Sequence, residues 1–125
     1  MIGYTTVGTN DLPAALAFYD DVFSAVGVGR LIDFGARGVA WGLAWDKPCY
    51  AVLTPYDGLP ATVGNGTMVA LVFKTRDEVL AIHARALALG GADEGAPRLR
   101  EGNLFAGYFR DLDGNKLCAY TLIRT

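Results

Sequence analysis

The sequence predicts an α+β fold in which two tandem βαβββ modules form a curled mixed sheet around a concave cleft, with the helices on its convex side. Three observations support this prediction. Strand-like and helix-like segments follow one another in the same order in the two halves. The longest run of turn-forming residues lies at the midpoint, where a linker between two modules belongs. The two predicted helices also agree in cap, apolar stripe and terminal glycine when one half is shifted onto the other.

The first module occupies about residues 1–57. Its first strand is predicted over Ile2–Thr9, which is rich in β-forming residues. A helix follows, because Asn10 or Asp11 can cap it and Pro13 suits its first turn. Its apolar face and its terminal glycine are Ala15, Phe18, Tyr19, Val22, Val26 and Gly27. Three short strands are predicted to complete the module, over Gly29–Phe34, Val39–Trp45 and Cys49–Thr54.

The second module occupies about residues 66–125, and both modules together are expected to make one domain. A strand over Met68–Phe73 is followed by a capping box, in which Thr75 and Glu78 satisfy backbone N–H groups at the helix start. The helix buries Val79, Ile82, Ala86 and Leu89 and ends at Gly90 and Gly91. One edge strand interrupted by Pro97 is predicted within Ala92–Gly102, followed by a hairpin of Phe105–Arg110 and Lys116–Ile123.

A shift of 64 positions superimposes the two predicted helices. It carries the cap Asp11 onto the cap Thr75, and Gly27 onto Gly91. It also carries the apolar Ala15, Phe18, Val22 and Phe23 onto four apolar residues, namely Val79, Ile82, Ala86 and Leu87. Because cap, stripe and glycine agree together, the pattern indicates a duplicated module rather than two unrelated amphipathic helices.

Alternation along the strands predicts which side chains face the cleft. In the strand from Met68, the side chains of Val69, Leu71 and Phe73 face the helices, and the intervening ones face away. Small and aromatic residues with a few hydroxyls are typical of a ligand pocket. Packing against a second subunit is the alternative reading of the same residues. The predicted ligand-binding residues are Tyr4, Thr6, Trp41, Tyr50, Met68, Ala70, Tyr108, Arg110, Cys118 and Tyr120.

Composition favours a globular, cytoplasmic protein. The chain has 125 residues, of which 52% are hydrophobic and 19% charged, and its net charge is −2. No apolar run approaches the roughly 20 residues of a membrane span, and no secretory signal is recognisable. The densest basic segment, Arg98-Leu99-Arg100, is too short for a nucleic-acid interface. Cys49 and Cys118 are expected to be free thiols.

With these elements in order, the chain resembles the vicinal oxygen chelate superfamily, also called the glyoxalase/bleomycin resistance/dioxygenase family, and within it a bacterial glyoxalase-like branch. The resemblance covers nearly the whole length. It rests on the opening Tyr4–Leu12 with Ala17-Phe18-Tyr19, on the middle stretch His83–Leu87 with Gly90-Gly91 and Glu94–Pro97, and on the hairpin Arg110–Asn115. Leu112 stands where the family usually has proline. The resemblance also implies a homodimer with the cleft near its interface.

The resemblance further implies a divalent metal held by His or Glu on the concave face. The family's ligand positions fall here on Tyr4, Ala51, Met68 and Cys118. Mg, Mn, Ni or Fe(II) require imidazole or carboxylate donors, which this set lacks. We therefore expect that the usual metal site is lost and that no cofactor is bound. A soft metal on Cys118 and Met68 is an alternative, although such sulfur pairs are more often core.

Three functions remain open at this stage. The first is a small-molecule binding protein of this superfamily. The second is a glyoxalase I-like lyase or a dioxygenase-like metalloenzyme with a non-standard site, and the third is a dimerisation module without a ligand. No catalytic residue is predicted, because His83 is interpreted as a partly buried helix residue and Asp111 as ordinary turn chemistry. Arg110 is the one cleft residue that would suit an anionic ligand, although solvation at a strand end is the simpler interpretation.

Overall fold

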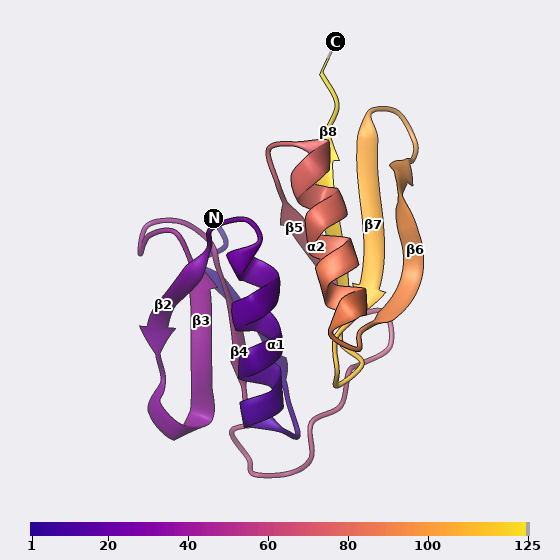
Figure 1. Cartoon of the computed structure of the whole chain (residues 1–125). Coiled ribbons are helices and arrows are strands. Elements are labelled where there is room, and N and C mark those ends of the chain that lie inside the picture. Colours follow the sequence, from indigo (N-terminus) through magenta and orange to yellow (C-terminus); the bar gives the residue numbers. More distant parts are fainter. Residues whose placement is uncertain (125) are drawn as a thin grey trace.

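Two βαβββ modules joined by a long loop make up the protein, for which a computed structural model describes residues 1–124 (Figure 1). Module one comprises β1 (Tyr4–Gly8), α1 (Leu12–Ser24), β2 (Gly29–Asp33), the 3-10 helix η1 (Gly35–Arg37), β3 (Gly38–Gly42) and β4 (Cys49–Leu53). Module two comprises β5 (Val69–Val72), α2 (Arg76–Ala88), β6 (Ala92–Leu99), β7 (Leu104–Arg110) and β8 (Lys116–Leu122). The predicted α+β class and its two modules are confirmed.

Each module forms its own four-stranded sheet, where the sequence predicted one curled sheet. The strand orders are β1-β4-β3-β2 and β5-β8-β7-β6, so the two halves share one topology. In both, the first strand runs parallel to the last and the other neighbours are antiparallel. Gly38 on β3 has a φ of 149°, and a Cβ there would lie 2.0 Å from the Val52 carbonyl oxygen. Only glycine therefore fits where β3 approaches β4.

The two helices follow the predicted duplication closely. Both are 13 residues long, and their bounds differ by the same shift as their caps. Asp11 accepts a hydrogen bond from the Ala14 N–H at 3.2 Å, and Thr75 accepts one from the Glu78 N–H at 3.1 Å. The terminal glycines correspond less well. Gly27 was matched to Gly91, but the glycine that ends α2 with a positive φ, as Gly27 does for α1, is Gly90. The glycine correspondence is therefore displaced by one position.

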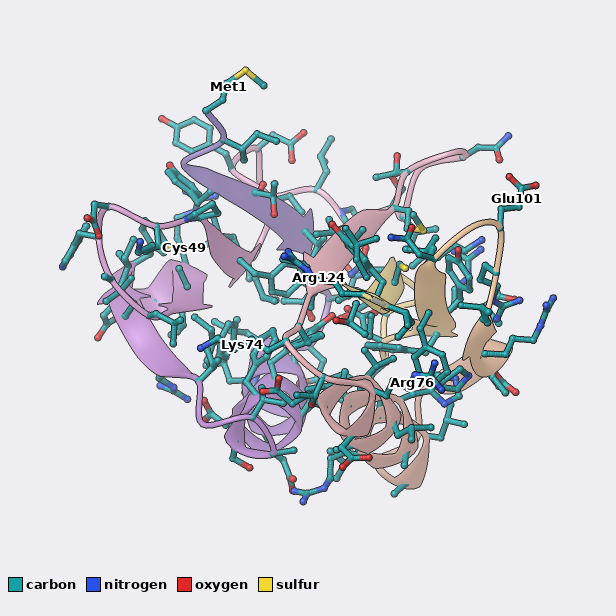
Figure 2. The ribbon with its side chains drawn as sticks, turned by 90° about the horizontal axis from the view of Figure 1, so that it is seen from above. Met1, Cys49, Lys74, Arg76, Glu101 and Arg124 are labelled. Carbon is teal, nitrogen blue, oxygen red and sulfur yellow. The ribbon has the colours of Figure 1, made fainter. Side chains whose placement is uncertain are left out.

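The hydrophobic core lies between the helices and one face of each sheet. Seen from above, α1 and α2 lie side by side, and the two sheets splay apart over them (Figure 2). The buried side chains form one continuous cluster across both modules, which includes Phe18, Tyr19, Val22, Val52, Ile82, Phe109 and Leu117. One face of each sheet is thus occupied by its helix, and the opposite faces point in different directions.

A buried hydrogen-bond network also joins the modules. The Tyr50 hydroxyl donates to the Tyr19 hydroxyl at 2.7 Å, and Tyr19 donates to Asp111 Oδ2 at 2.6 Å. Asn115 Nδ2 donates to the same carboxylate oxygen at 3.0 Å and to the Gly8 carbonyl at 2.9 Å. Asp111 is only 5% exposed. The interpretation of Asp111 as ordinary turn chemistry was incomplete, because its carboxylate also accepts a hydrogen bond from Tyr19 of the other module.

Candidate functional site

The face of module one that points away from α1 has a floor of small residues. Alternation along β1 and β4 directs Tyr4 and Thr6 to this face together with Cys49 and Ala51, which stand opposite them in the ladder. Ala40 on β3 and Ala51 have no exposed surface, because Leu31, Ile32 and Phe34 pack over them. Tyr4 is 54% exposed and lies beside Phe34, with 6.2 Å between ring centroids. The face is therefore closed at β2 and open at β1.

A pocket of about 440 Å³ lies where this face meets the loop that follows β4. Thr6 and Gly8 contribute to its wall from β1, and Arg37 and Tyr56 from the turns. The Arg37 guanidinium lies 5.2 Å from the centre of the Tyr56 ring, and its Nη2 donates to the Thr54 carbonyl at 2.9 Å. Of the predicted residues, Thr6 is the one that lines this pocket. The sequence does not indicate these contributions, because Arg37 lies in a turn between two predicted strands and Tyr56 in the predicted linker.

The corresponding face of module two brings together six of the ten predicted residues. Cys118 stands opposite Ala70 of β5 and opposite Tyr108 of β7, so it lies at the middle of the face. Its side chain is buried, which raises the pKa of the thiol against the opposing influence of Tyr108, Arg100 and Lys116. The thiol is therefore protonated at neutral pH. The predicted residues that lie on this face are Ala70, Tyr108, Arg110, Cys118 and Tyr120, together with Met68, which directly precedes β5 and alternates with Val69.

The module-two face also carries two cations that were not predicted from the sequence, Arg100 and Lys116. The Arg100 guanidinium lies 5.1 Å from the centre of the Tyr108 ring, and the Lys116 ammonium lies 5.6 Å from the same centre. In the sequence Arg100 stands out only as part of a short basic segment, and nothing links it to Lys116. Arg110, which was considered for an anionic ligand, forms an ion pair with Glu94 at 2.6 Å. Its charge is therefore already compensated.

We call the face of each sheet that points away from its helix the helix-distal face. Trp41 and Tyr50 do not lie on either helix-distal face, and their predicted place in the cleft was wrong. Both are buried against α1, where they contact the rings of Tyr19 and Phe23. Trp41 Nε1 donates to Asp20 Oδ1 at 3.0 Å. The physical reason is strand alternation. Trp41 lies two residues after Val39 on β3, and Tyr50 lies two residues before Val52 on β4, so both share the face that packs against α1. Both strands are apolar on both faces, so the sequence showed no alternation there.

His83 lies on the helix side of β7, away from Cys118. It is buried, and its Nε2 is 3.1 Å from Asp93 Oδ1 and 3.2 Å from the Tyr108 carbonyl oxygen. This agrees with the prediction of a structural helix histidine. A Cys–His pair is not formed, because the β7–β8 ladder separates the two side chains.

The donor set at the family's metal positions does not fit a hard divalent cation. Ala51 offers no donor, and the Cys118 thiol has a raised pKa although metals bind the thiolate. Tyr4 lies on β1 of module one and Met68 directly precedes β5 of module two, and both side chains are exposed. Within residues 1–124 no group of three or more His, Cys, Asp or Glu side chains is arranged to share a metal ion. No helix in that range is long and apolar enough to cross a membrane.

Comparisons with known proteins agree with this architecture. Residues 1–119 match the family model described as the Glyoxalase/Bleomycin resistance protein/Dioxygenase superfamily. A solved glyoxalase/bleomycin resistance protein from Albidiferax ferrireducens is 31% identical, with a TM-score of 0.89 over 98% of this chain and 99% of its own. None of the curated proteins compared with the chain matches it.

More distant solved structures share the fold alone. A glyoxalase/bleomycin resistance protein/dioxygenase family enzyme from Burkholderia phytofirmans is 18% identical, with a TM-score of 0.75 over 97% of this chain and 98% of its own. A lactoylglutathione lyase from Agrobacterium tumefaciens is 22% identical, with a TM-score of 0.67 over 97% and 92%.

Proposed function

The chain belongs to the glyoxalase/bleomycin resistance protein/dioxygenase superfamily, and from this premise we propose that it is a homodimeric small-molecule binding protein that does not use the superfamily's metal. One observation carries the proposal. The helix-distal faces keep aromatic and hydroxyl side chains suited to a ligand, whereas the four metal positions hold Tyr4, Ala51, Met68 and Cys118. The chain therefore has a surface suited to a small molecule but lacks the imidazole and carboxylate groups that would bind the metal.

A second copy of the chain would turn these open faces into enclosed clefts. The two faces of one chain point in different directions, and both carry exposed apolar side chains. Around a two-fold axis, module one of each copy can cover module two of the other, which gives two identical clefts. Each cleft would then have one wall from each copy. The exposed apolar residues that this arrangement would cover include Tyr4, Met68, Val72 and Leu122.

The metal question is tested by elemental analysis of the protein after gentle purification. The proposal predicts far less than one equivalent of bound metal and a melting temperature that added Ni, Zn or Fe(II) leaves unchanged. A metal content near one equivalent, with a higher melting temperature on loading, would instead favour a lyase-like or dioxygenase-like metalloenzyme.

Ligand binding is tested with a panel of aromatic and aliphatic compounds of positive, negative and zero charge. A compound that binds only the folded protein raises its melting temperature with concentration. We expect Tyr120→Ala to weaken binding of the active class about tenfold, the usual effect of losing one aromatic contact. Leu80→Ala is the matched control, since Leu80 is 45% exposed on α2. If no compound class changes the melting temperature, the protein is not a binding protein of this kind.

A further inference from the structure

The module-two face carries two cations, Arg100 and Lys116, that form no side-chain ion pair within residues 1–124. Arg100 and Lys116 both lie over Tyr108. The ion pairs among residues 1–124 involve four other basic side chains, namely Arg30, His83, Arg85 and Arg110. The whole chain carries a net charge of −2, so a positive face is not a consequence of overall composition.

The Arg100 guanidinium is fixed in place rather than free to move in solvent. Its Nε donates to the Ala106 carbonyl at 3.1 Å, and its Nη2 donates to the Ala96 carbonyl at 2.8 Å. Gly95 leaves room for the guanidinium, since a Cβ at that position would lie 3.0 Å from Arg100 Nη2. In the described part of the chain, Nη1 takes part in no hydrogen bond. A guanidinium held in this way loses little conformational entropy when it binds an anion.

Lys116 brings a second positive charge close to the Tyr108 ring from another strand. It begins β8, two residues before Cys118, so both side chains leave the strand on one face. Its ammonium and the Arg100 guanidinium share the Tyr108 ring as a neighbour. Cys118 supplies no negative charge at neutral pH, since burial raises the pKa of its thiol. Glu94, the nearest carboxylate along β6, is engaged by Arg110.

We propose that the module-two face binds small molecules that carry a carboxylate or a similar oxyanion on an apolar or aromatic body, with Arg100 and Lys116 holding the anion. This inference rests on the proposed binding function and specifies the class of its ligand. Tyr108 and Tyr120 provide the surface on which the body of the ligand packs. A nucleic acid is not suited to this face, because two fixed cations cannot follow a phosphate backbone.

Three naphthalene compounds of the same size test the charge preference in the unmodified protein. They are the carboxylate naphthoate, the neutral naphthamide and the cation naphthylmethylammonium. Affinities are measured by calorimetry and by amide chemical shifts of β7 and β8. We expect naphthoate to bind about tenfold more tightly than naphthamide, because only the carboxylate carries a negative charge and can accept two parallel hydrogen bonds from a guanidinium. Raising the salt concentration should weaken naphthoate binding selectively.

Variants of the two cations assign the preference to its residues. Arg100→Met should remove most of the preference for naphthoate and leave naphthamide affinity within about twofold. Arg76→Met is the matched control, because Arg76 also lies over an aromatic ring, at 5.2 Å from the Phe105 ring centre, but belongs to α2. Since Arg100 also bonds two backbone carbonyls, its loss can disturb β6. Lys116→Glu avoids this problem and should shift the preference toward naphthylmethylammonium.

The outcomes separate this inference from the function on which it rests. Equal affinity for the three compounds, or an Arg76→Met effect as large as that of Arg100→Met, would overturn the inference and leave the binding function standing. If none of the three binds while the wider panel contains a ligand, the inference also fails alone. If the whole panel is inactive as well, the two proposals fail together.

Discussion

At the scale of single residues, the Tyr19 hydroxyl occupies a decisive position between the two modules. It accepts from Tyr50 and donates to the buried carboxylate of Asp111. Burial, followed by the nearby Tyr50 and Asp111, raises the pKa of Tyr19 well above its ordinary value. The hydroxyl is therefore protonated at all physiological pH values and is always available as a donor.

Tyr19→Phe removes this donor. Asp111 Oδ2 then keeps only the hydrogen bond from the side chain of Asn115. Hydrogen bonds to charged groups contribute about 1.5–3 kcal/mol, so we expect a loss of about that size in the free energy of unfolding. Urea denaturation measures it. Tyr120→Phe is the control, because Tyr120 lies on the helix-distal face of β8 away from this network. Similar losses in the two variants would show that the network does not stabilise the fold.

The ion pair of Asp20 predicts a pH dependence of stability. The hydrogen bond from Arg30 is the main cause of a lowered pKa for Asp20, with a smaller contribution from Trp41. A carboxylate with a lowered pKa in the folded state stabilises the protein above its unfolded pKa of about 3.9. That stabilisation is lost as the pH falls through the lower, folded value.

Asp20→Asn should therefore lower the free energy of unfolding at pH 7, and the difference from the unmodified protein should shrink toward pH 3. The effect is expected to be small, because both side chains of the pair are more than a third exposed and solvent screens them. Chemical denaturation at the two pH values checks it. A difference that grows in acid would contradict the assignment.

Residue-scale features were the hardest to predict. Trp41 and Tyr50 could not be placed, because β3 and β4 are apolar on both faces and their phase is set by pairing with distant strands. Arg100 and Lys116 are both brought to the Tyr108 ring by the pairing of β6, β7 and β8, which no local sequence pattern specifies. By contrast, the faces of Met68, Ala70 and Cys118 were predictable, since these residues alternate with large apolar neighbours.

At the scale of secondary-structure elements, the start of α2 depends on its capping box. Thr75 accepts from the Glu78 N–H, and Glu78 Oε1 accepts from the Lys74 N–H at 3.0 Å. The second bond reaches one residue further back than a standard capping box, but it satisfies the same kind of backbone donor. This element was predictable because a cap is specified within four consecutive residues.

Thr75→Ala should lower the free energy of unfolding by about 1 kcal/mol, the usual effect of losing an N-cap side chain. Thermal and urea denaturation measure the change. Thr62→Ala serves as the control, since Thr62 is exposed in the loop between the modules. Thr75→Ser should retain most of the stability, because a serine hydroxyl can accept the same hydrogen bond.

The β6 strand shows the limit of prediction at this scale. Pro97 was expected to interrupt it, yet β6 runs continuously over Ala92–Leu99. The strand accommodates proline because its pairing with β7 shifts register between Gly95 and Arg98. Such an irregularity at a sheet edge removes the need for the missing N–H. Its position depends on β7, so the sequence of β6 alone could not specify it.

At the scale of the whole molecule, the direction of the two open faces predicts the assembly. If each face is covered by the other module of a second copy, a charge placed on it should separate the copies. Val72→Glu places a carboxylate at a residue that is 64% exposed on β5. We expect this variant to elute as a monomer in size-exclusion chromatography with light scattering, where the unmodified protein elutes as a dimer.

Leu80→Glu is the control for this prediction, because it introduces the same charge on α2, outside the proposed interface. It should leave the dimer intact. A dimer that tolerates Val72→Glu but not Leu80→Glu would place the interface on the helices and would remove the basis for shared clefts.

The buried network around Asp111 has a consequence for the covalent continuity of the chain. Asn115 donates to the Gly8 carbonyl, and the Asn10 N–H donates to Asp113 at 2.9 Å. The turn between β7 and β8 is therefore hydrogen-bonded to the end of β1 in the other module. The peptide linker is then not what keeps the halves together. A chain cut at the exposed Gly64–Asn65 bond should still purify as one folded particle, and its halves, expressed as separate polypeptides, should recognise each other and reassemble.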